Sequence, residues 1–200
     1  MTRIGTAERS TAETSIRVRI HLDGTGVVTV DSPIGFLDHL LTLFARHALV
    51  DLEVAASGDT HIDEHHTVED TALVLGRAID TALGERTGIR RYGDVRVPMD
   101  EALALCAIDL GGRATASIAP LADPLTAANA WLELWPHFVE TLAREARASV
   151  HLEVRGARST HHLVEGGVKA LARALRAAWE LDPRLADAAD AVPSSKGTLR

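Results

Sequence analysis

The sequence carries the same His-His-x-x-Glu signature twice, at residues 65–69 and 161–165, and this repetition constrains the fold more than any other feature. A further histidine precedes each copy at nearly the same distance, His39 in the first case and His137 in the second. Neighbouring segments repeat as well, since VDLEV at residues 50–54 returns as VHLEV at residues 150–154. The repeat predicts that the chain is a tandem duplication of one folding unit.

Each predicted unit contains short strands followed by helices. Residues 15–22 alternate polar and apolar side chains, and residues 27–30 are expected to return beside them as the second strand of a hairpin. Further strands are expected at residues 103–109 and 150–154, and helices at residues 37–48, 68–83, 131–148 and 162–179. The predicted fold class is α+β, a tandem duplication of a sheet-plus-two-helices unit. The expected boundaries are residues 1–88 for the first repeat, 89–182 for the second and 183–200 for a C-terminal tail.

Composition restricts the possible partners and location. The single cysteine, Cys106, lies in an apolar run, which excludes an intramolecular disulfide and a thiolate-rich zinc site and favours a reducing, cytoplasmic compartment. The polar N-terminus lacks a secretory apolar region, and no apolar run has the length of a membrane span. A net charge of −7 disfavours non-specific nucleic-acid binding. We therefore expect neither nucleic acid nor membrane as a partner, and a phosphorylated ligand would need a local cationic pocket.

The repeated signature predicts metal binding. On a helix, His65 and Glu69 share one face, whereas His66 lies about 100° around the axis and cannot easily serve the same ion. Two such helices imply two ions, each bridging the repeats. The grouping predicted from the repeat symmetry is His65, Glu69, His39 and His162 for one ion, and His161, Glu165, His137 and His66 for the other. Imidazole and carboxylate ligands suit Mn²⁺, Fe²⁺, Co²⁺ or Zn²⁺. A single copy is more often a surface histidine pair beside a glutamate than a metal site, but the duplication with a matching upstream histidine favours the metal interpretation.

Segments along the whole chain match one known family in order and spacing. They are RSTAET (9–14), GFLDHLLTLFARH (35–47), IDEHHTVED (62–70), GIRRYGDVRVPMDEAL (88–103), DLGGR (109–113), HFVETLA (137–143), HHLVEGGVKALARALR (161–176) and PSSKG (193–197). Through these segments the chain resembles the imidazoleglycerol-phosphate dehydratase family. The chain departs from the usual family pattern at Gly111, Ser159 and Val168, none of which is a candidate ligand.

The resemblance implies a fold, an assembly and a reaction. The fold is a duplicated unit similar to ribosomal protein S5 domain 2, assembled through trimers into a 24-subunit octahedral particle with two Mn²⁺ ions per chain. The reaction is the dehydration of imidazole-glycerol phosphate to imidazole-acetol phosphate in histidine biosynthesis, through a metal-bound imidazolate. A di-metal hydrolase and a metal-storage protein without chemistry are the alternatives.

The resemblance also implies residue roles. Glu13 and Lys169 are the expected catalytic residues, with Lys169 in contact with either the substrate or a metal ligand. The substrate phosphate is expected to bind Arg91, Arg113, Ser194, Ser195 and Lys196. Because these residues lie far apart along the chain, we expect a site built from both halves and the tail, within one subunit or together with neighbouring subunits. A single subunit is therefore expected to be inactive.

Overall fold

The computed structural model describes residues 2–119, 129–185 and 191–199. The first half contains β1 (Ile4–Ser10), β2 (Thr14–His21), β3 (Val28–Asp31), α1 (Gly35–Ala48), β4 (Asp51–Gly58) and α2 (His65–Leu83). Its four strands form one sheet in the order β1-β2-β4-β3, in which only β3 and β4 run parallel. The predicted hairpin between residues 15–22 and 27–30 is therefore wrong, because β4 lies between β2 and β3.

The second half repeats this plan. It contains β5 (Tyr92–Met99), β6 (Ala102–Asp109), β7 (Thr115–Ile118), α3 (Trp131–Glu145), β8 (Ser149–Arg155) and α4 (Thr160–Trp179), followed by a short 3₁₀ turn at Pro183–Leu185. Its sheet has the corresponding order β5-β6-β8-β7. The predicted α+β class and its duplication are confirmed, although the helix predicted to start at residue 68 begins at His65, so that both signatures lie in the first turn or two of a helix.

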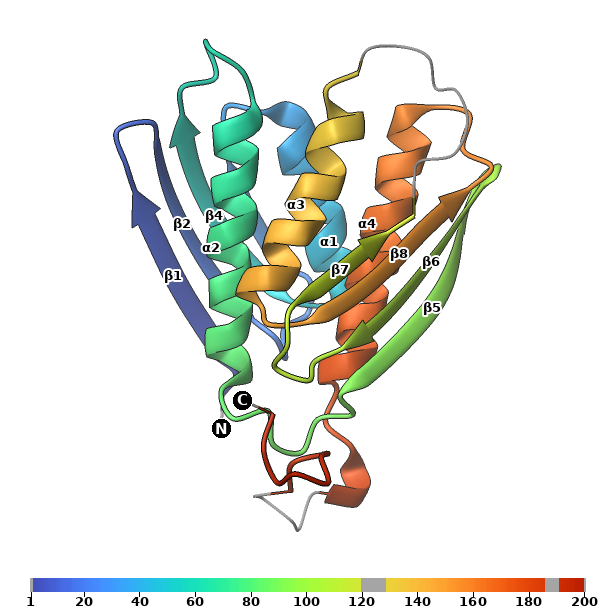
Figure 1. Cartoon of the computed structure of the whole chain (residues 1–200). Helices are drawn as coiled ribbons and strands as arrows, with labels where there is room; N and C mark the ends of the chain where they lie inside the picture. Colours follow the sequence, from blue (N-terminus) through green and yellow to red (C-terminus); the bar gives the residue numbers. More distant parts are fainter. Residues whose placement is uncertain (1, 120–128, 186–190, 200) are drawn as a thin grey trace.

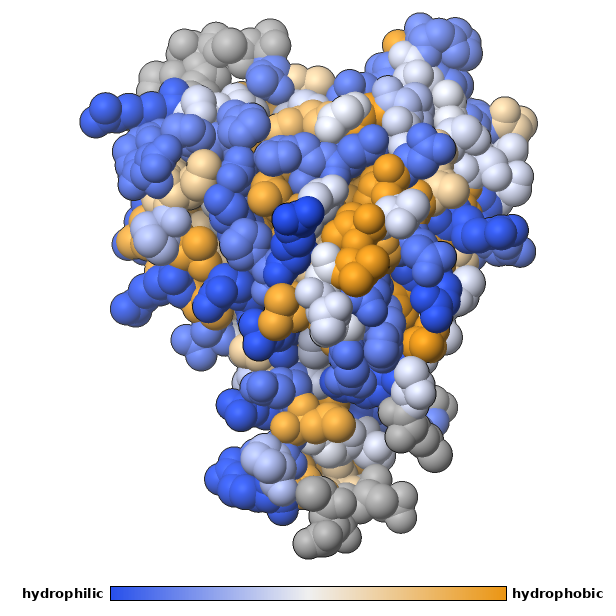
Figure 2. All heavy atoms as spheres, turned by 180° about the vertical axis from the view of Figure 1, so that it is seen from behind, coloured by the Kyte–Doolittle hydropathy of each residue, from blue (hydrophilic) through white to orange (hydrophobic). Residues whose placement is uncertain are grey.

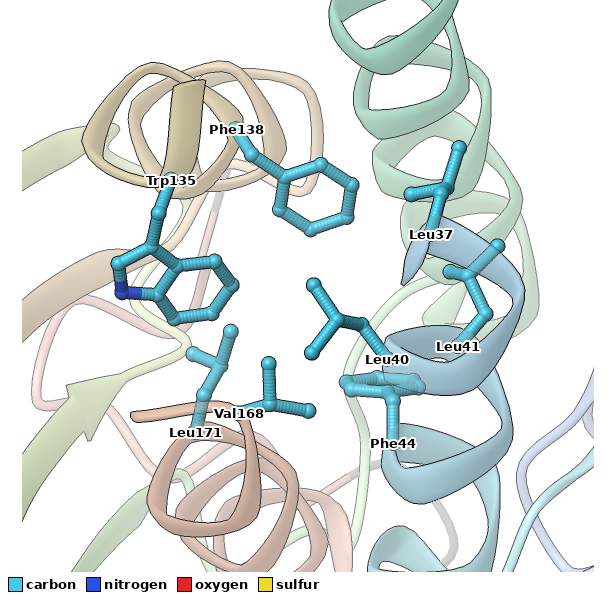
Figure 3. Close-up of a pocket in the computed structure, with 8 residues that line it drawn as sticks. All are labelled: Leu37, Leu40, Leu41, Phe44, Trp135, Phe138, Val168 and Leu171. Carbon is cyan, nitrogen blue, oxygen red and sulfur yellow. The ribbon is translucent and has the colours of Figure 1, made fainter. Parts of the chain in front are cut away.

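The helices lie between the two sheets, as Figure 1 shows. Helix α1 packs against α4, and α2 packs against α3, so every helix of one half meets a helix of the other. Eight buried side chains of α1, α3 and α4 meet where the halves join, as seen in Figure 3: Leu37, Leu40, Leu41, Phe44, Trp135, Phe138, Val168 and Leu171. The apolar cavity among them is only about 10 Å³, near the lower limit for one water molecule. This joint is packed core and leaves no room for a substrate.

Glycines mark the duplication at the level of single residues. Gly5 on β1 and Gly93 on β5 lie 88 residues apart. A Cβ atom at Gly5 would come within 1.8 Å of the Ala78 carbonyl oxygen, and one at Gly93 within 2.1 Å of that of Ala174. Each edge strand can approach its helix only because it has no side chain there. The repeat therefore extends into the first hairpin of each half, where the two halves share no repeated sequence motif.

The outer faces of the sheets are largely polar. Exposed and buried residues alternate along β2 and β6, as expected for strands with one face on a core. Figure 2, which views the molecule from behind, shows a mainly hydrophilic surface with separate apolar patches. Among the described helices, none is both long and apolar enough to cross a membrane. Cys106 is buried on β6, where desolvation raises the pKa of its thiol to about 12, so it serves as a packing residue.

Candidate metal centres

One group of possible metal ligands joins α1 to α4. His39 comes from α1, and His161 and Glu165 come from α4. The Nε2 atoms of His39 and His161 lie 3.3 Å and 2.9 Å from Oε2 of Glu165. The Glu165 side chain is only 10% exposed. We call this group the α1/α4 cluster.

A corresponding group joins α2 to α3. His65 and Glu69 come from α2, and His137 comes from α3. Nε2 of His65 lies 3.8 Å from Oε2 of Glu69, and Nε2 of His137 lies 3.2 Å from its Oε1. The His137 Nε2 atom is buried without a hydrogen-bond partner. A buried nitrogen in this condition is costly unless something binds it, and a metal ion would do so. We call this group the α2/α3 cluster.

Both clusters fit a divalent transition metal. Each offers two imidazole nitrogens and a carboxylate within 4.8 Å of one another, with no thiolate. Such ligands suit Mn²⁺, Fe²⁺, Co²⁺ or Zn²⁺. Each cluster also takes one residue from one half and two from the other. The expectation that each site bridges the two repeats is therefore met by the grouping of the side chains.

The predicted partners within each cluster were wrong. His39 was expected beside His65 and Glu69, but it lies with His161 and Glu165, and His137 lies with the first signature instead. The physical reason is the helix packing: α1 contacts α4 and α2 contacts α3, so the upstream histidine of each half meets the signature of the other half. Sequence spacing does not encode which helices are neighbours across the two halves.

His66 and His162 belong to neither cluster within the described chain. As helix geometry predicted, they have other neighbours than the preceding histidines. The ring centroids of His65 and His66 lie 6.1 Å apart and those of His161 and His162 lie 6.2 Å apart. Nδ1 of His66 lies 3.1 Å from Oδ2 of Asp59, a hydrogen bond that raises the pKa of His66. Both histidines are thus held by carboxylates outside the clusters.

His162 has its own carboxylate partner. Its Nδ1 lies 3.0 Å from Oε2 of Glu101. Backbone N–H groups of Arg158 and of Glu101 itself, together with His162, lower the pKa of Glu101 to about 2. Sequence reasoning missed Asp59 and Glu101, because acidic loop residues are usually solvated. The available signals were that Glu101 lies within the matched segment 88–103 and that Asp59 lies three residues before the matched segment 62–70.

Lys169 and Glu13 occupy different surroundings. The ammonium group of Lys169 lies 2.6 Å from Oε1 of Glu165, so of its two expected contacts it makes the one to a candidate metal ligand. Burial alone would raise the pKa of Glu165, but hydrogen bonds from Lys169 and His39 outweigh it and lower that pKa. The Glu13 side chain is 59% exposed, with its nearest carboxylate oxygen 3.9 Å from Nδ1 of His66. Glu13 is therefore accessible to a ligand.

The residues expected to bind phosphate lie at the end of the molecule opposite the two clusters. Arg91 donates to both carboxylate oxygens of Asp109, at 2.7 Å and 3.1 Å, and to the carbonyl oxygen of Pro193 at 2.8 Å. The ion pair with Asp109 raises the pKa of Arg91. Arg91 thus anchors the tail that carries Ser194, Ser195 and Lys196; of the expected set, Arg113, Ser195 and Lys196 are exposed.

The two clusters and the residues expected to bind phosphate are separated by the length of α4. The backbone N–H of Arg91 donates to Ala178, at the C-terminal end of this helix, whereas His162 lies at its start. Sixteen residues at 1.5 Å each put these ends roughly 24 Å apart. Figure 1 shows the same separation, with the tail at the bottom and the starts of α2 and α4 at the top. One small molecule cannot touch both sets in a single chain.

Comparisons with known proteins agree on one family. The family model for imidazoleglycerol-phosphate dehydratase matches residues 32–175. The imidazoleglycerol-phosphate dehydratase of Granulibacter bethesdensis is 49% identical over the full length of both chains, and that of Rubrobacter xylanophilus is 50% identical over 89% of this chain and 92% of its own. The crystal structure of the enzyme from Staphylococcus aureus covers 90% of this chain and 99% of its own, with a TM-score of 0.77 and 30% identity. The Pyrococcus furiosus structure covers 96% and 99%, with a TM-score of 0.75 and 31% identity.

Proposed function

Because the chain belongs to the imidazoleglycerol-phosphate dehydratase family, we propose that it is a metal-dependent enzyme that removes water from imidazole-glycerol phosphate to give imidazole-acetol phosphate. Family membership makes it a hydro-lyase of histidine biosynthesis. The observation that carries the metal dependence is the pair of matched His/His/Glu clusters, one of which contains the buried His137 Nε2, which makes no hydrogen bond although Oε1 of Glu69 lies 3.2 Å away.

The two clusters would hold one ion each, and the family resemblance favours Mn²⁺. When bound, two such ions would supply positive charge and a fixed template for the two ring nitrogens of the substrate. Lys169 donates to Oε1 of Glu165, which leaves Oε2 facing His39 and His161. Lys169 would therefore support the reaction by fixing the orientation of this carboxylate.

His66 and His162 would complete metal sites in neighbouring copies of the chain. Neither histidine belongs to a cluster of its own chain, although both occupy the same position, the second, in their His-His-x-x-Glu signature. Self-association through trimers into a 24-subunit particle would bring such histidines to a second chain. The separation of roughly 24 Å along α4 supports the same assembly, because the phosphate-binding residues of one copy would have to approach the clusters of another.

Within this composite site each polar group has a task. Glu13 would exchange a proton with the substrate, since its carboxylate is exposed and lies beside His66. Arg113, Ser195 and Lys196 would bind the phosphate by charge-assisted hydrogen bonds. Arg91 and Ser194 would contribute to phosphate binding and hold the tail in place through the contact of Arg91 with Pro193.

The test is turnover by the purified full-length protein. Protein stripped with a chelator and reloaded with Mn²⁺ should convert imidazole-glycerol phosphate to imidazole-acetol phosphate, and the stripped protein should not. Mass spectrometry of the products distinguishes the outcomes. Release of inorganic phosphate would indicate a hydrolase instead, and absence of any product with several divalent metals would contradict the proposed function.

A further inference from the structure

Two carboxylates outside both clusters contact His66 and His162, the second histidine of each signature, in the same way. Asp59 lies 3.1 Å from Nδ1 of His66, and Glu101 lies 3.0 Å from Nδ1 of His162. The Asp59 side chain is 14% exposed and that of Glu101 is 22% exposed. Among the described residues, every side-chain hydrogen bond of these two histidines runs through Nδ1. Nε2 of His162 lies 3.8 Å from Oδ2 of the exposed Asp100, too far for a hydrogen bond. Within the described chain neither Nε2 atom makes a side-chain hydrogen bond, so both can take another partner.

A carboxylate on one ring nitrogen determines what the other nitrogen can do. In a neutral imidazole it favours the tautomer with the proton on Nδ1, which makes Nε2 the acceptor, and it holds the ring in one orientation. Metal-binding histidines commonly have such a partner. The geometry at His66 and His162 therefore matches that of ligands prepared for a metal, although no cluster of their own chain lies against them.

We propose that Asp59 and Glu101 are positioning residues that present Nε2 of His66 and His162 to metal ions of neighbouring copies. This inference rests on the proposed function. It assigns a role to two residues that touch neither ion nor substrate and act through a histidine.

The two carboxylates come from loops that are not equivalent in the two halves. Their common contact with Nδ1 is therefore not a simple result of the duplication, and this favours a common role. Asp59 follows β4, whereas Glu101 lies in the turn between β5 and β6. The residue 88 positions before Glu101 is Glu13, in the turn between β1 and β2. Glu13 lies 3.9 Å from His66, too far for a hydrogen bond, because Asp59 occupies the Nδ1 position. Asp59 thus takes over in the first half the role that the hairpin glutamate plays in the second.

The competing explanation is direct metal binding by these groups. Glu13, Asp59 and His66 lie close enough to hold an ion of their own, as do Asp100, Glu101 and His162. In that case Asp59 would be a ligand, and its removal would matter even without the histidine. A double substitution distinguishes the two explanations.

Asp59 gives the cleaner experiment, because the only side-chain hydrogen bonds of its carboxylate among the described residues are with His66. Affinity for Mn²⁺ is measured by chelator competition on the full-length protein for Asp59→Ala, Asp59→Asn, His66→Ala and the double variant Asp59→Ala/His66→Ala. Glu153→Gln is the control, since this carboxylate contacts Arg155 and no histidine. Asp59→Ala should weaken one of the two ions about 10- to 100-fold. Asp59→Asn should weaken it less, because its amide oxygen can still accept from Nδ1.

The double variant should bind no more weakly than His66→Ala alone, because the carboxylate acts through this ring. A further loss in the double variant would show direct coordination and overturn the inference. If the wild-type protein binds Mn²⁺ and Asp59→Ala binds it with the same affinity, the inference is overturned while the proposed function stays intact. A wild-type protein that binds no ion would contradict the proposed function and the inference together. Glu101→Ala should in turn weaken the other ion.

Discussion

The two halves of the molecule share a fold but differ in the polar groups around their matched clusters. Both halves have the same strand order, the same close glycine contact and the same signature. Lys169, however, has Leu73 as its counterpart 96 residues earlier, so only Glu165 is paired with a lysine. Glu101 binds a histidine, whereas its counterpart Glu13 is left exposed. The duplicated features are those that place the candidate metal ligands, and the differing ones lie around the residues proposed to carry the chemistry.

The two halves also differ at the end of the molecule opposite the clusters. Arg91 has a counterpart in Arg3, and both arginines bind a neighbouring aspartate. Arg113 has only Thr25 as its counterpart, and only the second half is followed by the tail with Ser195 and Lys196. The residues proposed to bind phosphate therefore belong to the second half and the tail that follows it. This asymmetry suits a substrate with one phosphate and one ring that carries two nitrogens.

Replacing the signature glutamates should have the largest effect. Glu69→Gln and Glu165→Gln should each remove about one ion per chain and lower kcat/KM more than about 100-fold. Only Glu165→Gln should also destabilise the metal-free protein, by about 3 kcal/mol, because it leaves the mostly buried Lys169 without its carboxylate. Glu69 is 33% exposed and pairs with histidines, so its loss should cost less than about 1 kcal/mol. Elemental analysis and urea unfolding measure both quantities, and equal destabilisation would remove the asymmetry assigned to Lys169.

The two hairpin glutamates should give different kinds of defect. Glu13→Gln should lower kcat about 10²- to 10⁴-fold, the usual contribution of an acid/base group, while both ions stay bound. Glu101→Gln should first weaken metal binding, because this carboxylate holds His162. Steady-state kinetics at saturating Mn²⁺, together with metal analysis, separates the two. Loss of an ion from Glu13→Gln would place Glu13 in the metal site instead.

Arg113→Ala should have a smaller effect, confined to substrate binding. Loss of one charge-assisted hydrogen bond to phosphate, worth about 1.5–3 kcal/mol, should raise KM roughly 10- to 100-fold with little change in kcat. Thr25→Ala is the matched control at the counterpart position and should leave KM unchanged. Unaltered kinetics in Arg113→Ala would exclude this arginine from the phosphate site.

The sequence predicted the duplication and the divergence of the paired histidines, because both follow from spacing along the chain. It did not predict that His39 meets His161, since the choice of neighbouring helices depends on how the two halves pack. Strand β1 was also missed, because its inward residues include Gly5 and Ala7, which give little apolar signal. The roles of Asp59 and Glu101 depend on contacts between loops and helix starts, which no local pattern records.

The central claim is that each ion is shared between the two halves of one chain and a histidine of another. Crystals grown with Mn²⁺ and measured at the manganese absorption edge test it directly. We expect two anomalous peaks per chain, one in the α1/α4 cluster and one in the α2/α3 cluster, each completed by His66 or His162 of a neighbouring copy. Peaks against Asp59 or Glu101, or a peak bound by both histidines of one His-His pair, would contradict the account.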